Sequence, residues 1–259
     1  MKYIFVFIFF LLFIYLSIHY LTSSNINYIT KTEGYYIIDR LNYFNTFNED
    51  DFKIRKCDNI DHCRTIYKNN LTEFTKSEKN HLKKLVEYSN KLLKPYKSLY
   101  NIPWTFCKIK PDMENGFPHT HDHVIFLSKY FFKTNLEDKI ETLIHEKIHI
   151  YQRKYPEKTE ILYKHFNFNK NNKNTEKRRA NPDIDEYNYD YKGNEFYYQY
   201  NDNPRNINDI KKIYSKTSKE LIEKYGNENE HPNEIFAYLI SKKITTKTLK
   251  DNKIIEYIS

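Results

Sequence analysis

The chain has 259 residues, enough for a full-sized domain whose core needs neither a disulfide nor a metal to fold. The formal net charge of +8 favours anionic partners, but the lysines are interleaved with acids and form no dense basic block. We therefore expect no specific nucleic-acid partner.

The first residues predict a membrane-spanning helix. Residues 3–21 contain no formally charged side chain and approach the roughly 20 residues that cross a bilayer. We expect an uncleaved anchor at residues 1–22, because the small-residue cleavage site of a signal peptide is missing. The expected localisation is single-pass in a membrane, with a secreted protein as the alternative if the segment is cleaved. Residues 23–72 are polar and are expected to be a stalk.

Three cysteines allow one disulfide. Cys57 and Cys63 could close a small loop, which would leave Cys107 as a buried thiol in a strand. This count neither requires nor excludes an oxidising compartment.

Ordered structure is expected from residue 73 onward. Thr75 and Glu78 have capping-box spacing and begin an amphipathic helix that ends before Pro95. The alternating and aromatic segments that follow predict two strands, at residues 102–110 and 123–128.

The second half of the chain is predicted to be mainly helical around a polar insertion. Helical patterns cover residues 136–155, resume near Ile207 and restart after Pro232. The intervening residues, at about 167–206, are tyrosine-rich and predict either a loop-rich lobe or a hairpin.

His145, Glu146 and His149 form an H-E-x-x-H motif within the predicted helix at 136–155. Histidines four residues apart share one helix face and can bind one zinc ion at about 2.0–2.1 Å. Glu146 lies about 100° further round the helix, where it can reach a metal-bound water and act as its general base. The motif therefore predicts a Zn²⁺ cofactor with His145 and His149 as ligands and Glu146 as the catalytic residue.

A catalytic zinc site requires a third protein ligand, and Glu234 is the expected one. It is followed by apolar residues in a predicted helix after Pro232, and burying its carboxylate unpaired would be costly. His231 and Glu230 lie close enough in sequence to compete for this role.

Asn233-Glu234-Ile235-Phe236-Ala237 has the form N-E-x-x-A, and together with H-E-x-x-H it resembles the gluzincin group of zinc metallopeptidases. In that group the glutamate of the second helix is the third zinc ligand, so the resemblance assigns this role to Glu234. It also implies an α+β, zincin-like domain at residues 73–259, with a small mixed sheet packed on the motif helix and the glutamate-bearing helix. The strand before the motif helix commonly forms the substrate-facing edge in compact zincins.

Three further histidines alternate along the chain. In a strand, His119, His121 and His123 would share one face and could form a second metal site. A solvated loop or edge is the other interpretation, and a third is that His119 or His121 binds substrate carbonyls at the rim of the cleft.

Several other side chains could stabilise the oxyanion of the reaction, namely Tyr225, Arg178 and Arg179. Solvent exposure in a charged loop is the alternative for the two arginines. Asp183, which follows Asn181-Pro182, is expected to cap the next turn.

The function predicted from these motifs is that of a membrane-anchored zinc metallopeptidase that hydrolyses peptide bonds in a peptide or protein substrate, with Glu146 as base. The alternative is a zincin-like metal-binding protein without peptidase activity, acting as a membrane-tethered binding module. A third class is an interaction module that uses the tyrosine-rich segment at 187–200 as its binding surface.

Overall fold

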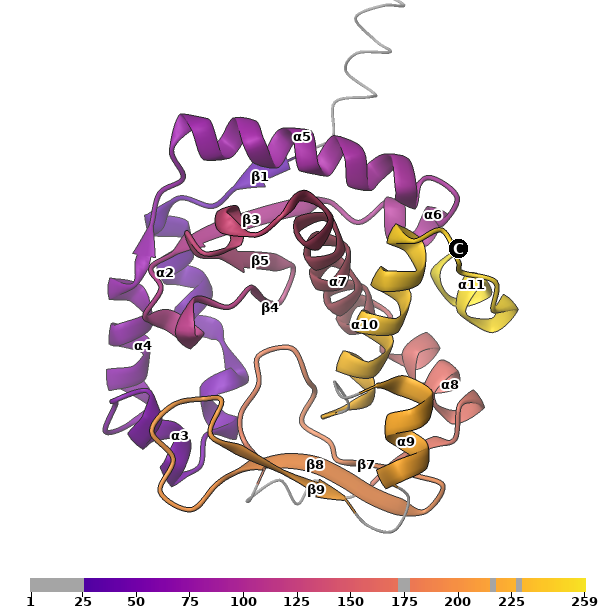
Figure 1. Ribbon diagram of the computed structural model, residues 1–259. Coiled ribbons are helices and arrows are strands. Elements are labelled where there is room, and N and C mark those ends of the chain that lie inside the picture. Colours follow the sequence, from indigo (N-terminus) through magenta and orange to yellow (C-terminus); the bar gives the residue numbers. More distant parts are fainter. Residues whose placement is uncertain (1–25, 172–177, 215–217, 227–229) are drawn as a thin grey trace, which may run out of the picture.

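In a computed structural model of the protein, residues 26–171, 178–214, 218–226 and 230–259 are described, and they form an α+β fold with two sheets (Figure 1). The strands are β1 (Ile26–Tyr28), β2 (Leu71–Thr72), β3 (Trp104–Ile109), β4 (His119–His121), β5 (Val124–Leu127), β6 (Phe168–Lys170), β7 (Tyr189–Tyr191), β8 (Asn194–Tyr200) and β9 (Ile210–Tyr214). The α-helices are α2 (Lys31–Arg40), α3 (Glu49–Ile54), α4 (Ile60–Asn69), α5 (Lys76–Leu93), α6 (Lys97–Tyr100), α7 (Leu136–Lys154), α8 (Pro156–His165), α9 (Ser218–Tyr225), α10 (Pro232–Thr245) and α11 (Asn252–Ile258). Short 3₁₀ helices are η1 (Asn42–Thr46), η2 (Met113–Gly116) and η3 (Phe131–Lys133).

The larger sheet is mixed and is built around β3, which is buried along its whole length. β1 and β5 pair with β3 in parallel, whereas β2 pairs with β3 antiparallel. β4 pairs antiparallel with β5 and forms the edge of the sheet. Alternate residues of β3 face opposite sides, so that Phe106 joins the core under α5 and α7 while Cys107 joins the core under α2 and α4.

The predicted stalk at 23–72 differs from the structure, because residues 26–72 belong to the folded domain. β1 extends the sheet, and α2 and α4 supply side chains to the second core, including Ile38 and Tyr67. The predicted disulfide between Cys57 and Cys63 is present, and Cys107 is a buried free thiol, as expected. The elements of this region are short and mostly polar, so their few core residues leave no long apolar pattern in the sequence.

The predicted membrane anchor at residues 1–22 lies outside the described residues. Among the residues that are described, no helix combines the length and the apolar composition needed to span a membrane. The longest helices, α5 and α7, have 18 and 19 residues but carry charged side chains along their length. The structure therefore does not support the predicted transmembrane helix. It does not support the predicted single-pass membrane location either, and both predictions are corrected.

The tyrosine-rich insertion folds as a hairpin of β7 and β8 within a four-stranded antiparallel sheet, β6-β7-β8-β9. Tyr189, Tyr191, Tyr198 and Tyr200 are buried, and Tyr189 and Tyr191 belong to the same core as α7. The helix predicted from Ile207 onward is wrong in its first part, which forms β9 and pairs with β8. Pairing with a neighbouring strand has overridden a helical pattern there.

The predicted motif helix corresponds to α7, and the predicted helix after Pro232 corresponds to α10. Figure 1 shows α7 between the mixed sheet and α10, with the second sheet at the far end from α5. Ile140, Ile144 and Ile148 of α7 are buried in the core, as the apolar stripe of that helix requires. The packing of α10 along α7 brings the two predicted ligand-bearing segments together.

Candidate metal centre

Two helices supply the predicted ligands. α7 carries His145 and His149 four residues apart, and both side chains are buried. α10 begins at Pro232, which suits the first helical position, and Glu234 lies in its first turn. Because α10 packs on α7, Glu234 faces the two histidines although it is far from them in sequence.

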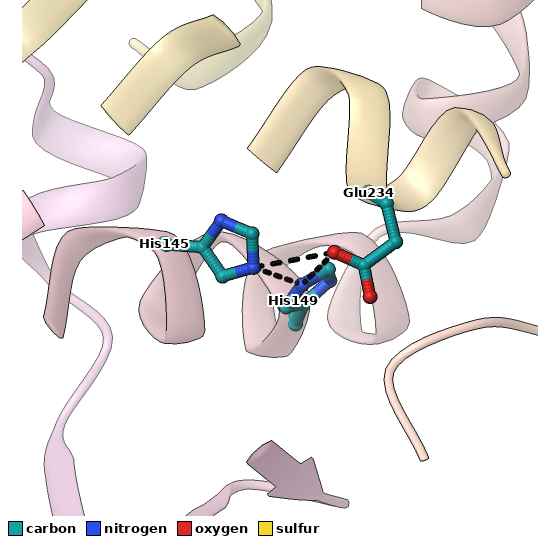
Figure 2. A group of neighbouring side chains, drawn as sticks. All are labelled: His145, His149 and Glu234. Carbon is teal, nitrogen blue, oxygen red and sulfur yellow. Dashed lines mark hydrogen bonds and ion pairs between the residues drawn. The ribbon is translucent and has the colours of Figure 1, made fainter. Parts of the chain in front are cut away.

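The ligand atoms converge on one point (Figure 2). The Nε2 atoms of His145 and His149 are 2.9 Å apart, and Oε2 of Glu234 lies 3.4 Å and 3.6 Å from them. Two ligand atoms of a tetrahedral zinc ion, each 2.0–2.1 Å from the metal, would lie about 3.3 Å apart. The three distances between the ligand atoms here are close to this value. His145, His149 and Glu234 therefore form a group that could hold a metal ion.

The electrostatics of the group agree with this geometry. Burial tends to raise the pKa of Glu234, but the two imidazoles outweigh it and hold this pKa well below its usual value. The pKa of Glu146 is raised well above its usual value by burial and by the carboxylates of Asp183 and Glu234. An ionised Glu234 is available as a ligand, and a cation in the group would favour the ionised form of Glu146 as well.

Gln152 fixes the orientation of one ligand. Its Nε2 donates to the backbone oxygen of Asn233 at 2.9 Å, so its Oε1 is the atom that accepts from Nδ1 of His149 at 2.8 Å. The hydrogen of this imidazole is thereby assigned to Nδ1, and the lone pair of Nε2 points toward the metal group. The same side chain joins α7 to the start of α10.

Glu146 is 3% exposed and lies on the wall of a cleft of about 710 Å³. Its Oε2 is buried and has no hydrogen-bond partner among the described residues. The cleft is also lined by His145 and Glu234, and by Phe117 and Tyr238. A buried carboxylate oxygen without a partner, next to the metal group, is available to a water molecule or a substrate.

No protein-family model matches the chain, and comparisons with curated proteins and with solved structures found no match either. The likeness to gluzincins remains a prediction based on the two motifs.

The two alternatives for the third ligand have other partners. His231 caps α10 by accepting from the backbone nitrogen of Asn233, and its Nε2 lies 3.3 Å from Oδ1 of Asp185. Glu230 forms an ion pair with Arg179. Neither side chain belongs to the group that could hold a metal.

The three alternating histidines do not share one environment. His119 and His121 lie on β4 and are buried in contact with each other and with Phe126. His123 lies in the turn between β4 and β5, is exposed and pairs with Asp122. No second group of potential metal ligands occurs in the part of the chain that the structure describes. His119 lines the cleft, and its Nδ1 faces the backbone oxygen of Phe117 at 2.9 Å.

Of the three side chains predicted as candidates to stabilise the oxyanion, Arg179 lines the cleft. Tyr225 packs against Phe168 and Phe236 in the core. Arg178 is buried, with its guanidinium donating to backbone oxygens that include that of Asp185, so its predicted exposure is wrong. Arg179 lines the cleft but is paired with Glu230.

The side chain of Asp183 was expected to cap the next turn, but its hydrogen bonds are to the edge strand β4. Its Oδ1 accepts hydrogen bonds from the backbone nitrogen and the hydroxyl of Thr120 on β4, at 2.8 Å and 2.6 Å. Arg153 of α7 donates to the backbone oxygen of Thr120 at 3.2 Å and to that of Pro182 at 2.6 Å. The polar backbone groups of Thr120 on this sheet edge are therefore already bonded to protein.

Sequence reasoning missed Gln152 and Asn181, both of which contact a ligand. Gln152 follows His149 by three residues and so shares its helix face, a signal that was available. Asn181 lies in an irregular segment far from α10 in sequence, and no local pattern indicates its position.

Proposed function

We propose that this protein is a zinc-dependent peptidase that hydrolyses peptide bonds in the cleft beside α7. The observation that carries the proposal is the convergence of three ligand atoms next to Glu146, a buried carboxylate with an unpartnered oxygen. Metal sites built only for structure are commonly closed by four protein ligands, whereas three protein ligands beside a cleft are typical of catalysis.

The ligand set favours zinc. Two imidazole nitrogens and one carboxylate oxygen are a common donor set of catalytic zinc sites. When bound, zinc supplies Lewis acidity, which polarises a carbonyl group and lowers the pKa of a coordinated water.

Glu146 supplies the proton transfers. Its carboxylate accepts a proton from the attacking water, whose oxygen forms a bond to the carbonyl carbon of the peptide. The carbon–nitrogen bond then breaks, and Glu146 returns the proton to the departing amine. One water is consumed, and no oxidant or other reactant is required.

The cleft has room for a peptide segment. Its volume of about 710 Å³ lies within the range of small-ligand sites, and it reaches from Glu114 and His119 to Asp138 at the start of α7. Phe117 and Tyr238 line it with large aromatic side chains that are 51% and 41% exposed. Exposed aromatic side chains beside the metal group suit contact with substrate side chains.

Metal content is the first test. We expect the purified protein to hold one equivalent of zinc, and the double variant His145→Ala/His149→Ala to hold none, as measured by atomic emission. A folded wild-type protein that takes up no zinc from solution would refute the proposal.

The second test separates catalysis from metal binding. We expect Glu146→Gln to keep its zinc and to lose hydrolysis of fluorescently labelled casein by about 10²- to 10⁴-fold, because the general base is removed. Glu141→Gln is the matched control, since Glu141 also lies on α7 and lines the cleft. Zinc-loaded wild-type protein that cleaves neither casein nor a mixed peptide library would count against a peptidase.

A further inference from the structure

The two carboxylate oxygens of Glu234 have different partners. Oε2 faces the Nε2 atoms of His145 and His149, and these three atoms form the metal group. Oε1 accepts a hydrogen bond from Nδ2 of Asn181 at 3.0 Å. One oxygen is thus directed to the metal position, while the other is already bonded to protein.

The amide of Asn181 is held in one orientation by its partners. Nδ2 also donates to Oε2 of Glu230 at 3.0 Å, and Oδ1 accepts from the backbone nitrogen of Asp183 at 2.9 Å. Ionised carboxylates can only accept and a backbone N–H can only donate, so a flipped amide would lose all three hydrogen bonds. The side chain therefore presents an N–H group to Glu234.

The two residues before Asn181 anchor its segment to other parts of the fold. The guanidinium of Arg179 donates to Glu230, with Nε 2.7 Å from Oε1. The backbone nitrogen of Ala180 donates to Oδ1 of Asp51 at 3.1 Å. These contacts tie the chain next to Asn181 to Glu230, before α10, and to Asp51, in the N-terminal part of the domain, so the position of Asn181 does not depend on its contact with Glu234 alone.

We propose that Asn181 is a positioning residue that restricts Glu234 to binding the metal through one oxygen. A carboxylate can bind an ion through one or both oxygens, and its second oxygen occupies a coordination position that a reaction would need. By bonding Oε1, Asn181 keeps that position open. The proposal rests on the metal-binding part of the proposed function and does not depend on hydrolysis.

Two variants test this proposal. Asn181→Ala removes the donor and frees Oε1. Asn181→Asp keeps the shape of the side chain and the hydrogen bond to the backbone nitrogen of Asp183, but it replaces the N–H donor with an oxygen. This second variant keeps the test possible if Asn181→Ala does not fold. The matched control is Asn208→Ala, because Asn208 is exposed and lines the same cleft without a contact to Glu234 among the described residues.

The measurements are zinc affinity, by competition with a chelating dye, and the visible absorption of the cobalt(II)-loaded protein. We expect both Asn181 variants to bind zinc about 10- to 100-fold more weakly, as is usual when the support of a metal ligand is removed. Cobalt(II) absorbs more strongly with four ligands than with five or six, so we expect weaker absorption from Asn181→Ala. Asn208→Ala should match the wild type in both measurements.

Wild-type zinc affinity in both Asn181 variants would overturn the proposal. So would a loss of affinity with an unchanged cobalt(II) spectrum in Asn181→Ala, because it would mean that Asn181 supports the fold without limiting how Glu234 binds. Zinc-loaded protein without hydrolysis would refute the peptidase and leave this test intact. Failure of the wild type to bind any metal would refute both.

Discussion

Replacing Glu114 by glutamine should change how the stability of the protein depends on pH. Glu114 is buried in η2, and its carboxylate accepts hydrogen bonds from Nε and Nη2 of Arg55 at 2.9 Å and 3.0 Å. The hydroxyls of Tyr43 and Tyr67 donate to the same carboxylate. This cluster joins the N-terminal helices to the segment before β4.

The pKa of the Glu114 carboxyl group determines how strongly its ionised form stabilises the folded state. Burial alone would raise it, but the charge and hydrogen bonds of Arg55 outweigh burial and lower the pKa of Glu114 from 4.5 to about 2. The folded state therefore binds this proton more weakly than the unfolded state does. The stabilisation is fully present above the unfolded pKa and is lost as the pH falls toward 2. At 1.36 kcal/mol per pKa unit, this shift corresponds to a stabilisation of about 3 kcal/mol.

Urea unfolding of the wild type and of Glu114→Gln between pH 6 and pH 3 measures this effect. We expect the difference in unfolding free energy between the two proteins to be largest at pH 6 and to shrink as the pH falls below about 4.5. Glu87→Gln, at an exposed position on α5, is the control and should show a small difference at every pH. A difference for Glu114→Gln that does not change with pH would refute the reasoning.

Three further predictions follow from buried contacts. Gln152→Ala should weaken zinc binding by about 10- to 100-fold, measured by dye competition, because His149 loses its hydrogen-bond acceptor; unchanged affinity would contradict this. Lys147→Met should cost about 1–3 kcal/mol in urea unfolding but leave zinc content unchanged, because the buried side-chain nitrogen donates to the backbone oxygen of Ile102, which would lose this donor, and not to the metal group. Reducing the disulfide between Cys57 and Cys63 should lower stability by about 2 kcal/mol while zinc stays bound; loss of zinc on reduction would contradict this.

Much of the fold after residue 73 was predictable because its signals are local. Capping boxes and apolar periodicity depend on residues within one or two helical turns, so α5, α7 and α10 were identified correctly. The N-terminal region was not, because its elements become stable only when they cover a sheet whose central strand, β3, lies more than 30 residues later in the chain. β9 shows the same limit, since its pairing with β8 decides its conformation.

The sequence by itself determined the chemistry of the candidate site: two imidazoles and a carboxylate base at helical spacing, and a second carboxylate in an apolar helix. Tertiary structure alone decided that Glu234, and not His231 or Glu230, meets the two histidines, because that choice depends on how α10 packs on α7. It also decided that Asn181 holds one oxygen of Glu234. Spacing within a helix is a local property, whereas a contact between segments far apart in the chain exists only after the core has formed.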